Sequence, residues 1–233
     1  MATFYKSEAL YCYDGTRYYN KKKVYLLKHF FLKRILPFFS YCFHPIFISV
    51  LATVFYFFIT TDRYFIYETV YIYTLQVLLI TVFIPLTLFY VLIMLGKIDS
   101  VMVTNVSQRK IPLTIHILLL SVLILKSITK ETSPELFYFF LGSIISSSIA
   151  LILVYFDKKI SLHMLGMSSF TIFCISCCMH FQVREVFIIS VLLFCNGLVA
   201  SSRLYMKAHT NKELVLGYLI GLFPQLFLLF FWL

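Results

Sequence analysis

The feature that most constrains this chain is a series of long, continuously apolar runs. The hydrocarbon layer of a membrane is about 30 Å thick, and a helix needs roughly 20 apolar residues to cross it. A transmembrane β-barrel would instead alternate apolar and polar residues in segments of about ten. The sequence therefore predicts an all-α fold, a polytopic transmembrane helical bundle with about six to seven spans. We expect these spans near residues 35–60, 70–95, 111–128, 135–156, 164–182, 186–200 and 214–232.

The composition supports a membrane protein and divides the chain in two. Hydrophobic residues make up 61% of the 233 residues and charged residues only 13%, which excludes an ordinary soluble domain. Residues 1–34 form a basic, aromatic leader that we expect to lie on the headgroups as an amphipathic helix; a sensor for one specific lipid is the alternative. Residues 35–233 contain no linker or repeat, so we expect a single transmembrane helical domain. No cleavable signal peptide is expected, because no small-residue cleavage site follows the first apolar run.

The basic residues are distributed unevenly between the two sides of such a bundle. With seven spans, the leader and the loops near 96–110, 157–163 and 201–213 share one side, which holds 16 of the 20 Lys and Arg residues. By the positive-inside rule that side is cytoplasmic. The net charge of +10 fits attraction to anionic headgroups, so we expect membrane lipids and no nucleic acid as partners. We expect a multi-pass protein of the cell (inner) membrane.

Two features inside the spans have structural interpretations. Cys174, Cys177 and Cys178 lie in an apolar run without His or Asp partners, so we expect them to be small, buried, apolar side chains. We expect neither a metal ion nor a cofactor. Pro85 falls inside the second span, where it is expected to kink the helix.

Three loops on the basic side share one design. They read SQRKIP (107–112), DKKISLH (157–163) and SSRLYMKAHTNKE (201–213), and each ends where a span begins. Pro112 suits the first turn of a helix, Ser161 is expected to be an N-cap, and TNKE predicts a capping box from Thr210 to Glu213. Because helix N-termini attract anions, three such ends beside basic side chains predict a phosphate site.

The same residues have a more ordinary interpretation. The Lys and Arg residues of the first two loops could simply be positive-inside charges, and His163 and His209 could be interfacial histidines. Histidine is nonetheless the side chain best suited to proton transfer near neutral pH, and it can attack phosphorus. The remaining histidines lack basic neighbours in the right place and are expected to be structural; they are His29, His44, His116 and His180.

The third loop resembles a signature of the type 2 phosphatidic acid phosphatase superfamily. That signature reads Ser-Arg, five residues, His, three residues, Asp, and SRLYMKAHTNKE matches it with Ser202, Arg203, His209 and, in place of Asp, Glu213.

The other two loops resemble the remaining signatures of that superfamily more loosely. ISLH keeps Ser161 and His163 of the pattern Pro-Ser-Gly-His, and Arg109 of QRKIP is the best match to a Lys followed later by Arg-Pro. The motifs occur in the order of the family, with two apolar spans between the second and third. The resemblance covers about residues 105–221 and indicates a divergent member.

The resemblance implies a metal-independent lipid phosphatase that works through a phosphohistidine. His209 would attack phosphorus, and Glu213, four residues on and so on the same face of a helix, would orient it. His163 would protonate the leaving oxygen and then activate water. The implied phosphate-binding residues are Arg203, Arg109, one of Lys158 and Lys159, Ser161 and Ser202. The substrate would be a lipid phosphomonoester or diphosphate, of the phosphatidic acid or isoprenyl phosphate type.

Departures from the family pattern leave other functions open. Glu213 has one methylene more than Asp, and Leu162 replaces a glycine, so a non-catalytic phospholipid-binding or scaffolding member of the same fold is the first alternative. A small transporter or channel is the second, although the chain has no inverted repeat, intramembrane carboxylate or paired broken helices. Family members usually place this site on the extracytoplasmic face, whereas the seven-span count places it with the cytoplasmic leader.

Overall fold

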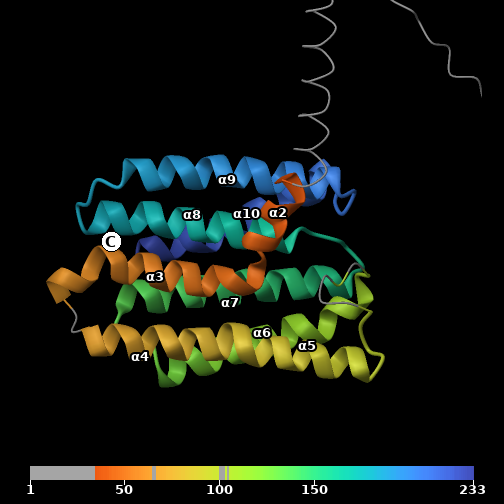
Figure 1. Cartoon of the computed structure of the whole chain (residues 1–233), viewed down its shortest axis with the longest axis horizontal. Helices are drawn as coiled ribbons and strands as arrows, with labels where there is room; N and C mark the ends of the chain where they lie inside the picture. The colour runs from red at the N-terminus through yellow and green to blue at the C-terminus, as the bar shows by residue number, and fades with distance from the viewer. Residues whose placement is uncertain (1–34, 65–66, 100–102, 104) are drawn as a thin grey trace, which may run out of the picture.

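The computed structural model describes residues 35–64, 67–99, 103 and 105–233 (Figure 1). The leader expected at 1–34 lies outside the described residues. The described part of the chain is helical and contains no strand. In chain order its elements are α2 (Leu36–Cys42), α3 (Pro45–Tyr64), α4 (Tyr67–Leu78), the π-helical turn η2 (Leu79–Phe83), α5 (Ile84–Met94), the 3-10 turn η3 (Ser107–Arg109), α6 (Lys110–Lys126), α7 (Pro134–Tyr155), α8 (Leu162–His180), α9 (Val186–Tyr205) and α10 (Asn211–Leu229).

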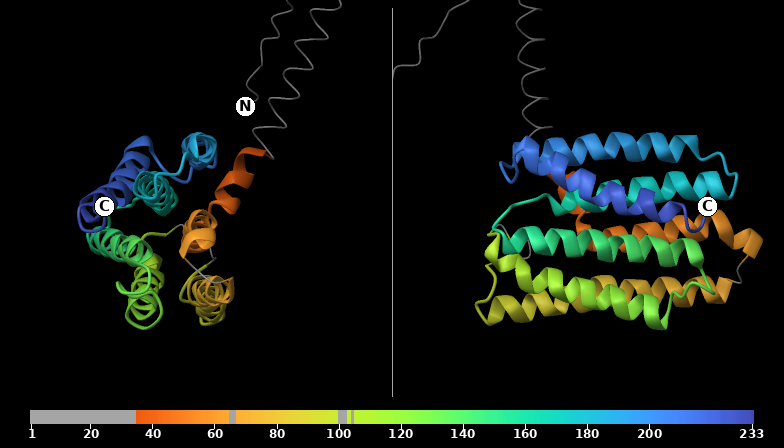
Figure 2. Two further views of the ribbon diagram at one scale, coloured as in Figure 1. Left: turned by 90° about the vertical axis from the view of Figure 1, so that its left-hand side faces the viewer. Right: turned by 180° about the vertical axis from the view of Figure 1, so that it is seen from behind.

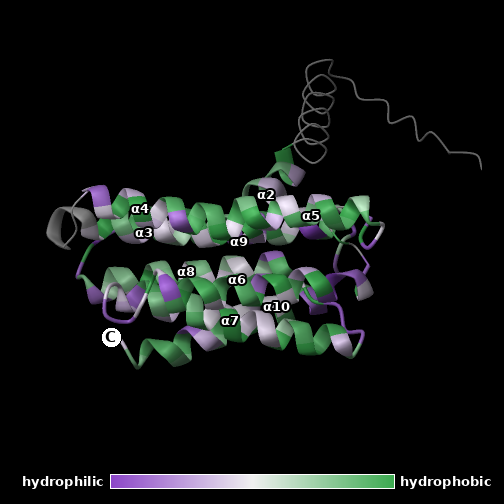
Figure 3. Ribbon diagram, turned by 90° about the horizontal axis from the view of Figure 1, so that it is seen from below, coloured by the Kyte–Doolittle hydropathy of each residue, from purple (hydrophilic) through white to green (hydrophobic). Residues whose placement is uncertain are grey.

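Six helical segments are long and apolar enough to cross a membrane. They are Tyr67–Met94, Ser107–Lys126, α7, α8, α9 and α10, and the bent pair of α2 and α3 would count as a seventh. The protein is therefore an all-α, multi-pass integral membrane protein, and the predicted range of six to seven spans is confirmed. Hydrophilic residues gather mainly at the two ends of the helices, while hydrophobic residues follow their lengths (Figure 3).

The first predicted span, over 35–60, is not one straight helix. The helix breaks at Phe43 and His44, and α2 and α3 meet at an angle of 68°. Pro45 is the reason, because proline has no N–H to continue the ladder and disfavours helical backbone at the residue before it. The break places His44 at the start of α3 rather than inside a span.

Pro85 changes the hydrogen-bonding pattern of the second span locally, with a π-helical turn just before it. The chain makes a π-helical turn, η2, directly before α5, and Pro85 lies in the first turn of α5. A proline at 85 removes the N–H that the carbonyl of Thr81 would accept in an α-helix, and a π turn is a common way to absorb such a loss. The hydroxyl of Thr81 in turn donates to the carbonyl of Val77 (2.8 Å).

The three predicted loops lie at one end of the bundle. In Figure 1 the links from α5 to α6, from α7 to α8 and from α9 to α10 are all at the right-hand end. α8 is the most buried of the spans and packs against α3, α7, α9 and α10, as the view nearly along the helix axes shows (Figure 2, left). This arrangement brings the starts of α6, α8 and α10 to the same membrane face.

α10 packs on α8 through two glycines one turn apart, in the sequence GYLIG. A Cβ on Gly217 would collide with the carbonyl oxygen of Ser161, and a Cβ on Gly221 with that of Leu165. Small residues at this spacing let membrane helices approach backbone to backbone. At the loop end, the N–H of Ser161 donates to the carbonyl of Glu213 (3.2 Å). The beginnings of α8 and α10 are thereby held side by side.

We predict that Gly221→Ala destabilises the protein, because the added methyl group has no room against the backbone of α8. Overpacking of this kind costs about 1–3 kcal/mol, so the thermal midpoint in detergent should fall by several degrees. Gly197→Ala is the matched control, since a Cβ on Gly197 of α9 meets nothing within 4 Å. A midpoint unchanged by Gly221→Ala would contradict the close approach.

We also predict that the loop between α7 and α8 is cytoplasmic, because the basic residues lie on its side of the membrane. In a variant without native cysteines, Lys158→Cys should react with an impermeant maleimide only after the cells are permeabilised. Arg184→Cys, in the exposed loop between α8 and α9 at the other end of the bundle, should react in intact cells. The reverse labelling pattern would place the candidate site on the extracytoplasmic face.

Candidate active site

The N-terminal ends of α8 and α10 are capped as the sequence predicts. The N–H of Met164 donates to Ser161 Oγ at 3.4 Å, and that of Glu213 donates to Thr210 Oγ1 at 3.4 Å. The bond from the Glu213 N–H is the half of the predicted capping box in which the N-cap hydroxyl accepts. The two caps fix where each helix begins, and so where His163 and His209 lie.

His209 and Glu213 form a close pair. His209 Nδ1 lies 2.7 Å from Glu213 Oε2, and the imidazole is buried while the carboxylate is partly exposed. His209 precedes Thr210, the N-cap of α10, so the expectation that both side chains share one helix face is wrong. They meet because the carboxylate of Glu213 turns back over the first turn of the helix, as it does in a capping box.

The surroundings of His209 keep its imidazole neutral at pH 7. Burial is the largest cause and lowers the pKa of His209 to about 4. The hydrogen bond to Glu213 acts in the opposite direction, whereas the charges of Arg109, Arg203 and Lys159 lower the pKa further. A neutral ring that donates Nδ1–H to a carboxylate has its lone pair on Nε2. His209 is thus arranged as a nucleophile or a base.

His163 is held in one tautomer by a backbone carbonyl. Its Nε2 lies 3.1 Å from the carbonyl oxygen of Ser40 in α2. Because a carbonyl can only accept, Nε2 carries the proton and Nδ1 of the neutral ring carries the lone pair. His44 stands edge-on to His163, with ring centroids 5.2 Å apart and planes at 87°. α2 and the break that follows it therefore supply both neighbours of this histidine.

Two buried arginines accompany the histidines. Arg109 donates from Nε to the carbonyl of Val103 (3.0 Å) and from Nη1 to that of Ile160 (2.9 Å). Arg203 is equally buried, but its Nε and Nη1 have no hydrogen-bond partner among the described residues. Neither arginine has a carboxylate within ion-pair distance in that part of the chain. A buried guanidinium without partners is costly, so this end of the bundle is suited to an anion.

One cavity of about 150 Å³ joins these groups. At its polar end it is lined by His44, Arg109, His163, Arg203 and His209. Beyond them the walls are mainly apolar and come from α3, α5, α6, α7 and α8. The apolar lining includes Ile46, Ile48, Leu88, Phe89, Leu92, Leu113 and Leu165. A cationic end joined to an apolar chamber matches an amphiphile with an anionic head.

The other predicted site residues take different places. Lys159 is partly buried, and its charge acts on both His209 and Glu213. Lys158 is exposed, and neither lysine lines the cavity. Ser161 and Ser202 are fully buried and face other parts of the protein. Ser161 caps α8, and Ser202 Oγ lies 2.7 Å from Ser40 Oγ, which ties α9 to α2. The two serines therefore hold the helices that form the cavity in place, and neither lines the cavity itself.

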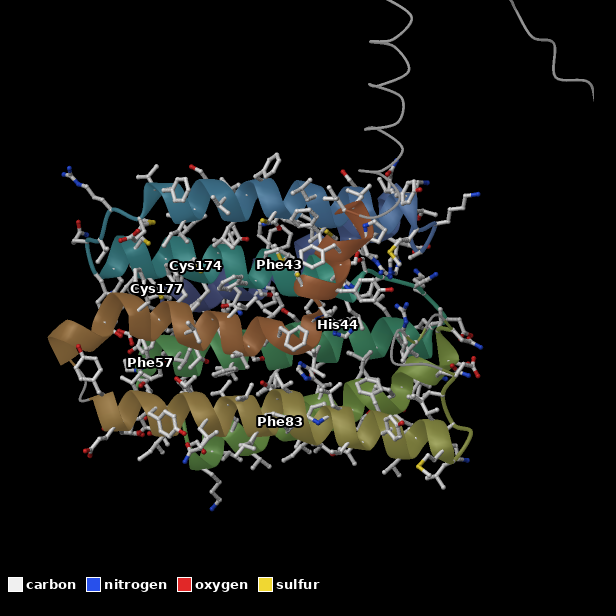
Figure 4. All side chains as sticks on the ribbon, in the orientation of Figure 1. Phe43, His44, Phe57, Phe83, Cys174 and Cys177 are labelled. Atoms are coloured by element: carbon white, nitrogen blue, oxygen red, sulfur yellow. The ribbon has the colours of Figure 1, made fainter. Side chains whose placement is uncertain are left out.

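Sequence reasoning missed two histidines that line the cavity. His44 and His116 were interpreted as structural, yet both face it. Figure 4 shows His44 where α2 gives way to α3. Pro45 was the available signal for His44, because a helix that begins at a proline leaves the preceding residue in a loop. His116 lies on the same face of α6 as Arg109 and Pro112, at seven and four residues from them, and this periodicity was the signal.

The other histidines and the cysteines lie elsewhere. His180 lies 3.3 Å from Glu135 at the opposite end of the bundle, where Tyr56 also donates to that carboxylate (3.0 Å). Cys174 and Cys177 are fully buried in the apolar core (Figure 4), as expected for structural residues. His29 lies outside the described residues. Within the described ranges, no three His, Cys, Asp or Glu side chains are grouped so that they could hold a metal ion.

The chain was compared with known proteins. No protein-family model, curated protein or solved structure matches it. The resemblance to the type 2 phosphatidic acid phosphatase superfamily therefore depends on the motif residues and on where the fold places them.

Proposed function

We propose that the protein is an integral-membrane phosphatase that hydrolyses a lipid phosphomonoester or diphosphate through a phosphohistidine. One observation carries the proposal: neutral His209, bonded to Glu213, lines the same cavity as Arg203, whose buried Nε and Nη1 have no partner among the described residues. A nucleophile beside an unpaired, buried cation is the arrangement that attack on a bound phosphate needs.

The basic residues would bind and orient the phosphate. Arg203, whose Nε and Nη1 have no partner among the described residues, can donate to two nonbridging oxygens through a pair of adjacent donors, either Nε with Nη2 or Nη1 with Nη2, in the fork geometry that guanidinium groups favour. Arg109 would add its remaining donors, and Lys159 its charge from the rim. These contacts would neutralise the negative charge of the phosphate oxygens, which otherwise repels the lone pair of the attacking imidazole. They would also hold phosphorus in line with Nε2 of His209.

In the first step, Nε2 of His209 attacks phosphorus. The P–N bond forms while the bond from phosphorus to the lipid oxygen breaks, and His163 gives the leaving oxygen a proton from Nδ1. This requires the imidazolium form of His163, which the negative charge of the bound phosphate favours. Glu213 stabilises the positive charge that develops on His209, as the third group of a triad does.

In the second step, the neutral His163 that remains takes a proton at Nδ1 from a water molecule. The oxygen of that water attacks phosphorus, the P–N bond breaks, and inorganic phosphate leaves with His209 neutral again. The bond from Nε2 of His163 to the carbonyl of Ser40 holds the ring so that the same nitrogen serves both steps.

A non-catalytic lipid-binding member of the fold is the alternative with a specific observation in its favour. Leu162 lines the cavity next to His163, at the position where the family pattern has glycine. A leucine side chain there takes room that a phosphate could use. Such a protein would bind lipid phosphates without turning them over.

We predict that purified protein releases phosphate from lipid phosphates and that His209→Asn abolishes the release. Loss of the nucleophile should lower kcat by at least about a thousandfold. Glu213→Gln keeps the size of the side chain but removes its charge, and should lower kcat by roughly a hundredfold with little change in KM.

Two results would count against the proposal. Release that persists in His209→Asn would exclude a phosphohistidine at this position. Tight binding of lipid phosphates with no turnover by the wild type would favour the non-catalytic alternative.

We predict that the neighbouring lysines differ in effect. Lys159→Ala should lower kcat/KM by about tenfold, because it removes a charge close to His209 and Glu213. Lys158→Ala is the matched control, since that side chain is exposed and is not among the charges that act on His209 or Glu213. Assays of phosphate release at several salt concentrations would separate the two; equal losses would show that only the general charge of the loop matters.

A further inference from the structure

The cavity lining also contains polar side chains that the phosphate chemistry does not use. Two of them, Ser143 and Ser169, already donate to the carbonyls of Phe139 and Gly221 (2.9 Å each). Ser49 of α3, His116 of α6 and Ser147 of α7 also line the cavity, and we call them the inner polar group. On α6, His116 follows Arg109 by two helical turns on the same face, which places it about 10 Å deeper along the axis. The inner polar group therefore lies inside the bundle, beyond the cationic end.

These three side chains make no hydrogen bond to any residue that the structure describes. Other hydroxyls on the same helices do: Thr53 donates to the carbonyl of Ser49 (2.9 Å), and Ser148 to that of Ile144 (2.8 Å). On α6, Thr114 donates to the carbonyl of Lys110 (2.9 Å). Hydroxyls in apolar helices usually satisfy themselves in this way. Ser49 and Ser147 face the cavity instead, together with an imidazole.

The neighbouring walls make no hydrogen bond to the inner polar group in the described part of the chain. α5 contributes Leu88, Phe89 and Leu92, which have no hydrogen-bonding side chains. The hydroxyls of Ser143 and Ser169 already donate to backbone carbonyls. A purely hydrocarbon chain in this space would leave two hydroxyls and an imidazole unpaired in an apolar setting, which is unfavourable. An oxygen atom of the ligand would pair them, since hydroxyls donate and an imidazole offers one donor and one acceptor.

We propose that Ser49, His116 and Ser147 form a second subsite, which hydrogen-bonds an ester carbonyl oxygen of the lipid a few bonds from its phosphate. The subsite rests on the proposed function, because it assumes that the phosphate occupies the arginine end. It deepens that function by selecting acylglycerol phosphates over isoprenyl phosphates, which have no oxygen beyond the phosphate. The selectivity would come from hydrogen bonds to the side chains of Ser49, His116 and Ser147, and not from the arginines that bind the phosphate.

Binding of non-hydrolysable phosphonates to the full-length protein in detergent tests the subsite without requiring turnover. The three probes are a short-chain diacylglycerol phosphonate, its dialkyl ether analogue and farnesyl phosphonate. We expect the ester probe to bind best. Ser147→Ala and His116→Leu should each weaken its binding by roughly five- to tenfold and change farnesyl phosphonate binding by less than about twofold.

Ser148→Ala is the matched control, because this neighbouring hydroxyl already donates to a carbonyl and lies outside the cavity lining. It should leave the preference between probes unchanged. Thermal midpoints of all variants show whether each protein is folded, and Ser147→Ala is the smaller change should His116→Leu fail to fold.

The outcomes separate the subsite from the proposed catalysis. Equal loss for ester and farnesyl probes, or a wild type that binds both equally well, would overturn the subsite even where turnover is found. Selective ester binding without any phosphate release would support the subsite and reject the catalysis. An ether analogue that binds as tightly as the ester would also overturn the subsite, because the ether lacks the carbonyl oxygen that the inner polar group is proposed to bind.

Discussion

α10 approaches α8 so closely that neither Gly217 nor Gly221 has room for a Cβ atom, and the candidate site depends on this contact. Because lipid tails are as apolar as the helices, small residues and close packing decide which helices pair. The pairing here aligns the first turns of both helices, where the N–H of Ser161 bonds the carbonyl of Glu213. Two loops separated by the whole of α8 and α9 thus present His163 and His209 to one cavity.

Once those loops are aligned, electrostatics determine the state of the histidines. Arg109 and Arg203 are buried without a carboxylate partner in the described part of the chain. Their charge opposes protonation of His209, adding to the effect of burial, so this end of the cavity contains two cations and a neutral imidazole. An arriving phosphate would neutralise the arginines and favour protonation of His163 at the same time. In the proposed reaction, binding would thereby prepare the proton donor that the first step requires.

Features that depend on residues close together in the sequence could be predicted, whereas contacts between residues far apart in the sequence could not. The helical bundle, the caps at Ser161 and Thr210, and the shared membrane face of the loops depend on local composition and span parity, and the sequence predicts them. The contact between His163 and the carbonyl of Ser40 joins residues 123 positions apart, and no local pattern reports it. Two features did have local signals. Pro45 marks the break before α3, and the spacing of Arg109, Pro112 and His116 places His116 on the cavity face of α6. Apolar composition alone hides both, because it predicts only that each segment is a span.

The two departures from the family pattern, Glu213 in place of aspartate and Leu162 in place of glycine, disturb the structure less than the sequence comparison suggests. The longer arm of Glu213 reaches His209 at 2.7 Å while the residue still serves the cap of α10, so the extra methylene fits the separation between helix and loop. Leu162 begins α8 in ordinary helical backbone, where glycine has no conformational advantage. The difference that matters at position 162 is the volume of the leucine side chain beside the proposed phosphate site. A leucine that narrows the mouth while leaving the arginines accessible would select among lipid headgroups, and only one that covers Arg203 would abolish binding.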